Sequence, residues 1–211
     1  MTLEIKQLFD LFETSEKLKV TKRWLNTKSM REKESSADHS WNLAFLTFMT
    51  AEELKLDINV LKSVKIALVH DLVEALAGDT DYSLIAFGIK TSKEKRSMEL
   101  SAIQEIEKIA PKKSGHELAE LWQEYEEGET KEAKFVKALD KIEGINHMLC
   151  KGYKCFDHPE LIAPYPRKAV LDFPPLIPMY QELLERLKPE FEKKGWEWKQ
   201  EYEIDIKDDI K

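Results

Sequence analysis

Hydrophobic residues recur every three or four positions along most of this chain, which is the spacing of a helix with one buried face. The clearest run predicts one face of a helix from Leu61, Val64, Leu68, Leu72, Ala75 and Leu76. The same spacing predicts helices over residues 3–18, 37–55, 58–77, 92–109, 115–127, 130–151 and 175–194. The pattern therefore indicates an all-α protein.

Residues with strong turn and capping preferences mark several of the expected helix ends. Ser35 and Asp38 stand three apart at the start of the second helix, as in a capping box. Gly78 follows the third helix where a left-handed residue commonly ends one, and Pro111 breaks the helix before it. Residues 156–178 are rich in proline, so we expect an irregular segment lying over the helical body.

The domain organisation follows from length and composition. The 211 residues are 42% hydrophobic and 35% charged, which suits one domain with a real core and a charged surface. We expect that domain to span residues 1–190, with a metal-binding core within residues 37–150. Residues 191–211 are expected to form a C-terminal extension, either a short strand or a frayed end.

Charge and cysteine content narrow the class of partner. The formal net charge of −7 argues against binding to nucleic acid polymers or membrane surfaces, but it leaves room for a small anionic ligand. No apolar run reaches the roughly 18 residues of a membrane span, and the first residues do not resemble a signal peptide. Cys150 and Cys155 are too few for a disulfide framework, so we expect a cytoplasmic protein.

Three ionisable residues interrupt the apolar helix predicted over residues 58–77. They are His70, Asp71 and Glu74, and Asp79 follows just beyond the helix end. His70 and Glu74 are four residues apart, so they should stack on one helix face. Burying an unpaired charge there would cost several kcal/mol, about 3–5 when one partner is missing. A salt-bridge partner, a shifted pKa or a metal ion would resolve this cost.

Two further helices offer residues that could complete a metal site. His39 lies in the first turn of the helix over 37–55, and Asp140 interrupts the apolar face of the helix over 130–151. Two imidazoles and two carboxylates suit one divalent transition ion such as Co, Mn, Ni, Fe or Zn. Four protein ligands would leave positions for water and substrate, which is typical of a catalytic site. Taken alone, a histidine such as His39 at a helix start is more often a helix cap or a surface residue, and an aspartate such as Asp140 is more often a salt-bridged acid.

The order of these residues resembles the H…HD…D signature of the HD-domain metal-dependent phosphohydrolases. The flanking segments ESSADHSWNLA, HDLVEALAGD, KRWLNTKS and KALDKIEGI resemble those of the 5'-deoxynucleotidase branch, over roughly residues 5–150. The resemblance implies a single-domain helical bundle of the HD-domain type, often dimeric. It implies four metal ligands: His39, His70, Asp71 and Asp140.

The resemblance also implies roles for four other residues. Glu74 would position or deprotonate the attacking water, and Asp79 would share in catalysis or contact the substrate. Arg23 would bind the phosphate. Trp24 would press against the deoxyribose and help to exclude a 2'-hydroxyl. Without the resemblance, Arg23 reads as an ordinary surface arginine and Trp24 as a core residue.

The implied reaction is hydrolysis of a deoxyribonucleoside 5'-monophosphate to a deoxynucleoside and phosphate by a cytoplasmic homodimer. Three alternatives remain open on the sequence. An HD-type hydrolase could act on a triphosphate, an alarmone or a cyclic nucleotide. The protein could bind metal and nucleotide without catalysis. His70, Asp71 and Glu74 could also be salt-bridged residues of a helical scaffold.

Overall fold

The computed structural model of the protein describes residues 3–203, and this part of the chain is helical, with no strand beyond one isolated bridge between Lys22 and Ser35. The all-α prediction is therefore confirmed. The helices are α1 (Leu3–Glu16), α2 (Ser36–Glu53), α3 (Val60–Val69), α4 (Glu74–Ala77), α5 (Tyr82–Ala86), α6 (Ser92–Ile109), α7 (Lys112–Glu127), α8 (Lys131–Lys151), α9 (Pro159–Ile162), α10 (Arg167–Asp172) and α11 (Ile177–Lys194).

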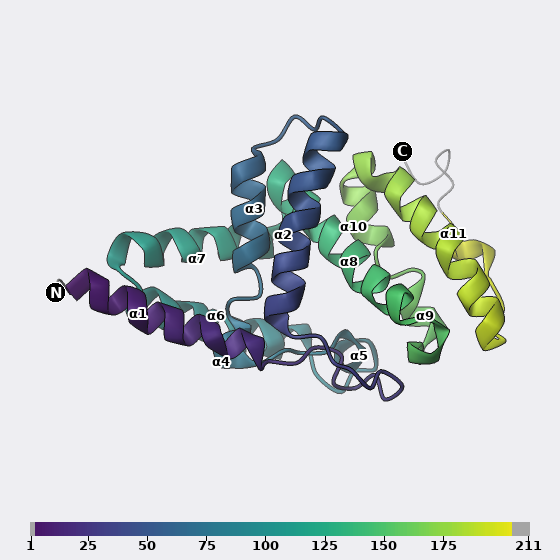
Figure 1. The fold of residues 1–211 in the computed structure, drawn as a ribbon, viewed down its shortest axis with the longest axis horizontal. Helices are drawn as coiled ribbons and strands as arrows, with labels where there is room; N and C mark the ends of the chain where they lie inside the picture. The colour runs from purple at the N-terminus through teal and green to yellow at the C-terminus, as the bar shows by residue number, and fades with distance from the viewer. Residues whose placement is uncertain (1–2, 204–211) are drawn as a thin grey trace.

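Helices α2, α3 and α8 form the centre of the molecule (Figure 1). α2 packs along α3, and both pack against α8. α1, α6 and α7 lie on one side of this centre, whereas α9, α10 and α11 lie on the other (Figure 1). Segments from both halves of the sequence therefore enclose the same three helices.

Helix α8 lies in the core because its sequence is apolar on the predicted face. Phe135, Leu139 and Ile142 recur at helical spacing, and all three are buried. Asp140 is buried on the same helix. The hydrophobic face thus carries a carboxylate into the centre of the fold.

The start of α2 confirms the predicted capping box. The Ser35 hydroxyl accepts a hydrogen bond from the Asp38 backbone N–H at 3.1 Å, and the Asp38 carboxylate accepts one from the Ser35 backbone N–H at 3.1 Å. Because this cap starts the helix at Ser36, His39 falls in the first turn, where it is fully buried.

The prediction of a single helix over residues 58–77 is wrong. α3 ends at Val69 and α4 begins at Glu74, with a turn between them. In this turn the N–H of Leu72 bonds to the carbonyl of Val69, and the N–H of Glu74 bonds to that of Asp71, each over three residues rather than four. Such bonds wind the backbone at three residues per turn, as in a 3₁₀ helix. The four-residue stacking of His70 on Glu74 therefore does not apply.

The prediction of the core face of α3 is also wrong in part. Leu61 and Leu68 are 67% and 48% exposed, and Leu76 of α4 is exposed as well. The buried face consists of Ser63, Ile66, Ala67 and Val69. Small residues on this face let α3 lie close to its neighbours, so the bulky leucines remain outside. Leu72 and Ala75, in contrast, are buried as predicted.

The proline-rich segment is more regular than predicted. Residues 156–178 form α9, α10 and a short 3₁₀ turn at Pro174–Leu176, so the expectation of an irregular segment is wrong. The expected position over the helical body is confirmed, because α10 packs on α8 and Ile162 and Val170 are buried. This segment also covers the side of the site described below.

The residues that follow the main body pack against it as far as the structure describes them. Phe191, at the end of α11, is fully buried, and Trp198 meets it edge-to-face with ring centroids 5.2 Å apart. Gln200–Tyr202 form a 3₁₀ turn, not the short strand considered from the sequence. The rest of the expected extension, residues 204–211, lies outside the described part. No helix within residues 3–203 is long and apolar enough to span a membrane.

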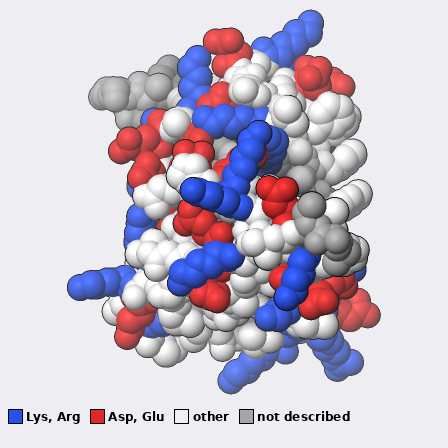
Figure 2. All heavy atoms as spheres, turned by 90° about the vertical axis from the view of Figure 1, so that its left-hand side faces the viewer, with Lys and Arg blue, Asp and Glu red and all other residues white. Residues whose placement is uncertain are grey.

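Surface charges of both signs are mixed on the face nearest α1 and α7 (Figure 2). Lys65 and Glu117 form one exposed ion pair, between α3 and α7. Exposed pairs of this kind contribute about 0.2–1 kcal/mol each. The stability of the fold must therefore come mainly from the buried faces of its helices.

We predict that Leu139→Ala lowers the free energy of unfolding by about 2–5 kcal/mol, because Leu139 is fully buried in α8. Leu61→Ala is the matched control. It removes the same atoms from an exposed position of α3 and should change that free energy by no more than about 0.5 kcal/mol. Urea unfolding followed by circular dichroism measures both. Equal losses in the two variants would contradict the assignment of the core.

Candidate metal centre

Four side chains from different parts of the chain converge at the centre of the molecule. His39 comes from α2, His70 and Asp71 from the turn after α3, and Asp140 from α8. The Nε2 atoms of His39 and His70 are 3.3 Å apart. Asp140 Oδ1 lies 3.2 Å from His39 Nε2, and Asp71 Oδ1 lies 3.2 Å from His70 Nε2. The structure thus brings together all four residues predicted as metal ligands.

Both imidazoles are oriented by their other ring nitrogen. His39 Nδ1 lies 2.6 Å from Glu143 Oε2, and His70 Nδ1 lies 2.9 Å from the carbonyl oxygen of Ala67. Both partners are hydrogen-bond acceptors, so each Nδ1 carries the hydrogen and donates it. Each Nε2 then presents a lone pair to the centre, which is the tautomer that a metal ion requires.

This arrangement needs a positive charge between the groups. The two Nε2 atoms face each other at 3.3 Å, that of His39 beside Asp140 and that of His70 beside Asp71. Burial lowers the pKa of His39, but hydrogen bonds to Asp140 and Glu143 outweigh it and raise the pKa to about 10. The surroundings therefore favour a cation at this point. Two nitrogens and two carboxylates fit a divalent transition ion, so the four residues could hold one.

The Asp140 carboxylate is held on its outer side by two neighbours. Its Oδ2 atom accepts hydrogen bonds from Tyr125 Oη at 2.6 Å and from Lys141 Nζ at 2.7 Å. Burial by itself would raise the pKa of Asp140, but Lys141 and His39 hold it well below the usual range. Asp140 is thus a carboxylate whose Oδ1 faces the histidines and whose Oδ2 is anchored.

Asp71 is held in a similar way by Arg23. Arg23 Nη1 donates to Asp71 Oδ2 at 2.6 Å, and Arg23 Nε lies 3.6 Å from Glu34 Oε2. Burial would raise the pKa of Asp71, but His70 and Arg23 hold it far below the usual range. The guanidinium is consequently fixed at the edge of the centre.

Glu74 and Asp79 lie beside the four converging residues and are weaker acids than usual. Glu74 is 4% exposed, and its Oε2 accepts a hydrogen bond from Ser36 Oγ at 2.6 Å. Burial, followed by the charges of Asp71 and Asp79, raises the pKa of Glu74 well above its usual value. Burial is also the main cause that raises the pKa of Asp79, to about 6. A carboxyl group with a raised pKa can take up and release a proton near neutral pH.

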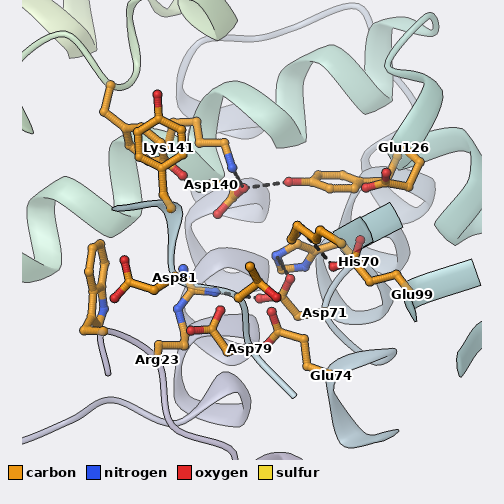
Figure 3. Close-up of a pocket in the computed structure, with 16 residues that line it drawn as sticks. Arg23, His70, Asp71, Glu74, Asp79, Asp81, Glu99, Glu126, Asp140 and Lys141 are labelled. Carbon is orange, nitrogen blue, oxygen red and sulfur yellow. Dashed lines mark hydrogen bonds and ion pairs between the residues drawn. The ribbon is translucent and has the colours of Figure 1, made fainter. Parts of the chain in front are cut away.

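A cavity that is partly open to solvent lies against this centre (Figure 3). Its wall contains seven of the eight predicted site residues: Arg23, Trp24, His70, Asp71, Glu74, Asp79 and Asp140. The eighth, His39, is buried behind His70. In Figure 3, Asp71, Glu74 and Asp79 gather on one side of the space, with Asp140 and Lys141 across from them. The cavity thus exposes carboxylates and cations to the same bound molecule.

Trp24 stands at the edge of the cavity in a strained backbone conformation. Its φ of 61° lies in the left-handed region, which costs a bulky residue about 1–3 kcal/mol. The backbone around it is held in place, because Lys33 Nζ donates to the Trp24 carbonyl at 2.5 Å and the Arg23 N–H donates to the Glu34 carbonyl at 3.0 Å. The indole ring lies against Gly144 of α8. Strain of this kind is typical of residues positioned for function.

Several residues of the site were missed in the sequence. Glu143 orients His39 and accepts a second hydrogen bond from Asn42 Nδ2 at 2.6 Å. Glu143 stands three residues after Asp140, and this spacing in the sequence places both on one face of a helix. Lys141 directly follows Asp140, so its closeness to Asp140 could also be seen in the sequence. Tyr125 reaches Asp140 from α7, and no spacing within one helix could reveal that contact.

A second group of possible metal ligands lies behind His39. Glu34, Glu143 and His147 have ligand atoms within 4.8 Å of one another. Glu143 is already bonded to His39, and Glu34 Oε1 lies 3.2 Å from His147 Nδ1. His147 therefore pairs with a buried carboxylate. This group supports the orientation of His39 and Arg23.

The sequence of the chain is similar to those of known proteins. A family model described as HD domain matches residues 15–160. The 5'-deoxynucleotidase HDDC2 of Dictyostelium discoideum is 38% identical over 145 residues, which are 64% of this chain and 73% of that protein. The human 5'-deoxynucleotidase HDDC2 is 35% identical over 132 residues, 62% of this chain and 60% of that protein. The chain thus spans less than two thirds of the human relative.

Solved structures share the fold over a larger part of the chain. A predicted metal-dependent phosphohydrolase from Magnetospirillum magnetotacticum MS-1 superposes with a TM-score of 0.70 at 24% identity, covering 96% of this chain and 99% of that one. A conserved hypothetical protein from Pyrococcus furiosus gives a TM-score of 0.64 at 30% identity, covering 84% and 99%. The fold, including the C-terminal helices, therefore recurs in other proteins.

We predict that Glu143→Gln weakens binding of a divalent ion by about 10–100-fold, because the amide cannot hold His39 Nδ1–H as a carboxylate does. Calorimetric titration of the metal-stripped protein with Mn or Zn measures the affinity. Glu132→Gln, the same chemical change at the start of α8, is the control and should bind as the wild type does. An unchanged affinity in Glu143→Gln would show that Glu143 does not support the centre.

Proposed function

Because the chain belongs to the HD-domain family, we propose that it hydrolyses the phosphate monoester of deoxyribonucleoside 5'-monophosphates. The observation that carries the proposal is the buried cluster of two histidines and two aspartates facing a cavity with further carboxylates and cations. Relatives named 5'-deoxynucleotidase support the choice of substrate. The protein is then a metal-dependent phosphomonoester hydrolase.

In this proposal His39, His70, Asp71 and Asp140 hold one divalent transition ion, with Co, Mn, Ni, Fe and Zn as candidates. When bound, such an ion supplies Lewis acidity toward a phosphate oxygen. Lys141 and Tyr125 keep the Asp140 carboxylate in place, and Glu143 does the same for the His39 ring. The orientation of the ligands therefore does not depend on the substrate.

Glu74 is the proposed general base. Its carboxylate is fixed by Ser36, and its raised pKa suits a group that removes a proton from water. The water oxygen forms a bond to phosphorus while its proton passes to Glu74. The bond between phosphorus and the 5'-oxygen breaks, and Asp79 gives its proton to that oxygen. The products are a deoxynucleoside and phosphate.

Arg23 and Trp24 are proposed to bind the rest of the substrate. The planar guanidinium of Arg23 can donate two parallel hydrogen bonds to a phosphate, and Lys141 offers a second cation across the cavity. The ring of Trp24 forms an apolar wall for the deoxyribose. A 2'-hydroxyl placed against that ring would lose its hydrogen bonds to water, which costs about 1–3 kcal/mol. This cost favours deoxyribonucleotides over ribonucleotides.

Phosphate release from matched deoxyribonucleoside and ribonucleoside monophosphates tests the function. We expect metal-stripped protein to be inactive and added Mn, Co, Ni, Fe or Zn to restore release, with deoxyribonucleotides preferred by about tenfold or more. Nucleoside triphosphates and cyclic nucleotides belong in the same panel. Metal-dependent release from those alone would replace the proposed substrate, and no release from any nucleotide would refute the enzymatic function.

Glu74→Gln is expected to lower kcat by about 10²–10⁴-fold, because the amide cannot accept the proton from water. Metal content, measured by elemental analysis, should stay at the wild-type level, since Glu74 is not a proposed ligand. Glu99→Gln is the matched control: Glu99 also lines the cavity but is paired with Lys95 at 2.8 Å. Loss of metal together with activity in Glu74→Gln would make Glu74 a ligand rather than a base.

We also propose that the protein is a homodimer. Trp41, Phe45 and Phe48 are exposed on one face of α2, and the rings of Trp41 and Phe45 are stacked with centroids 5.8 Å apart. Contiguous exposed aromatic residues of this kind commonly mark a protein interface. A second copy of the chain packing on this face would remove them from water.

Phe45→Glu is expected to convert the dimer into a monomer at micromolar concentration, because it places a charge in the apolar face. Ile89→Glu introduces the same charge at another exposed apolar residue and should leave the dimer intact. Sedimentation equilibrium distinguishes the two states. A monomeric wild type, or a dimer that persists in Phe45→Glu, would exclude this interface.

A cytoplasmic location is proposed as well. Cys150 and Cys155 are free thiols in the structure, and Cys150 is exposed. Exposed thiols persist in reducing compartments. This supports a reducing environment, as expected for an enzyme of nucleotide metabolism.

A further inference from the structure

A second cavity lies beside the metal centre and shares a wall with it. We call it the side pocket, and it is open to solvent on one side. Trp24, Asp81, Tyr82 and Tyr165 line both cavities. The side pocket is therefore adjacent to the proposed catalytic cavity, and Trp24 is part of the wall that the two share.

The lining of the side pocket differs from that of the metal centre. Its inner wall is apolar and is formed by Ile145 and Met148 of α8 together with Leu161 and Ile162 of α9. Polar side chains also line the pocket but contribute little of its surface; they are Thr27, Asp81, Ser83, Asp157 and His158. An apolar cavity with a few polar groups is the usual form of a small-molecule site. A planar, largely apolar molecule suits it better than a phosphate does.

Helix α8 contributes residues to both the metal centre and the side pocket. Ile145 and Met148 follow Asp140 by five and eight residues, which is about 7.5 and 12 Å along a helix. Trp24, the proposed wall for the deoxyribose, lines both cavities and so lies between the metal centre and the side pocket. A molecule with its phosphate at the centre and its sugar against Trp24 would extend its third part into the side pocket.

We infer that the side pocket binds the nucleobase of the substrate and that Asp157 selects bases carrying an amino group. The inference rests on the proposed function. Ile145, Met148 and Leu161 offer apolar contacts to the flat faces of the base. The Asp157 carboxylate accepts hydrogen bonds but cannot donate them. It therefore favours the amino groups of adenine, guanine and cytosine over the carbonyl oxygens of thymine.

The structure fixes Asp157 and the segment that carries it. Asp157 Oδ2 accepts a hydrogen bond from the Ser29 backbone N–H at 3.4 Å, which joins this segment to the loop that follows Trp24. The neighbouring His158 ring packs edge-on against Phe87, with centroids 4.9 Å apart. The proline-rich segment 156–178 thus supplies part of the lining of the side pocket.

Substitutions that fill the pocket test whether the base binds there. Leu161→Trp places a large ring in the side pocket, and the measurement is the ratio of kcat/KM for dAMP to that for 2-deoxyribose 5-phosphate, which lacks a base. We expect this ratio to fall by about tenfold or more. Met148→Phe provides a second, smaller change should Leu161→Trp fail to fold. An unchanged ratio in a folded variant would overturn the inference.

Asp157→Asn tests the selection of the base. The wild type should prefer dAMP over dTMP, and the variant should reduce this preference, because an amide can donate to a carbonyl oxygen as well as accept. Glu160→Gln, the same change at a neighbouring exposed residue, is the control and should keep the wild-type preference. Equal kcat/KM values for dAMP and dTMP in the wild type would show that Asp157 does not select the base.

Calorimetry with deoxyadenosine separates this inference from the proposed function, because it needs no turnover. Binding to the wild type that is weakened by about tenfold in Leu161→Trp would support the side pocket even if no monophosphate were hydrolysed. Hydrolysis of deoxyribonucleotides by the wild type, with binding and the kcat/KM ratio unaffected by Leu161→Trp, would leave the proposed function standing and refute the side pocket alone.

Discussion

The convergence of His39, His70, Asp71 and Asp140 on one buried point is the constraint on which the rest of the site depends. The Nε2 atoms of the two histidines are 3.3 Å apart, and each lies 3.2 Å from a carboxylate oxygen, so the site favours a cation at this point. The surrounding residues keep this arrangement in place. Glu143 and the Ala67 carbonyl orient the rings, while Arg23 and Lys141 hold the outer oxygens of the carboxylates. The fold thus stabilises a cluster that would not assemble on its own.

Different parts of the fold hold the proposed metal ligands and line the rest of the cavity. α2 and α8 pack together with α3 at the centre and carry His39 and Asp140, while His70 and Asp71 lie in the turn that follows α3. The cavity walls away from these residues come from the strained loop at Trp24 and the short helices of residues 156–178. Metal binding and substrate selection therefore rest on different parts of the chain.

Much of this arrangement was predictable because the relevant signals are local. The repeat of apolar residues predicted α8 and its buried face, and the Ser35–Asp38 cap predicted the start of α2. The order of histidines and aspartates, with its flanking segments, identified the four residues that converge. Glu143 and Lys141 lie within one of those segments but could not be given partners, because a partner on another helix is decided by packing.

The sequence by itself determined the helical class, most helix boundaries and the identity of the converging residues, because periodicity, caps and motif order are properties of neighbouring positions. Only the tertiary structure decided which face of α3 is buried, since that depends on how closely α2 and α8 approach it. It also decided the turn at residues 70–73, the contact of Tyr125 with Asp140, and the side pocket beside Trp24. The contact of Tyr125 and the side pocket join residues far apart in the chain, and no spacing within one helix specifies such contacts.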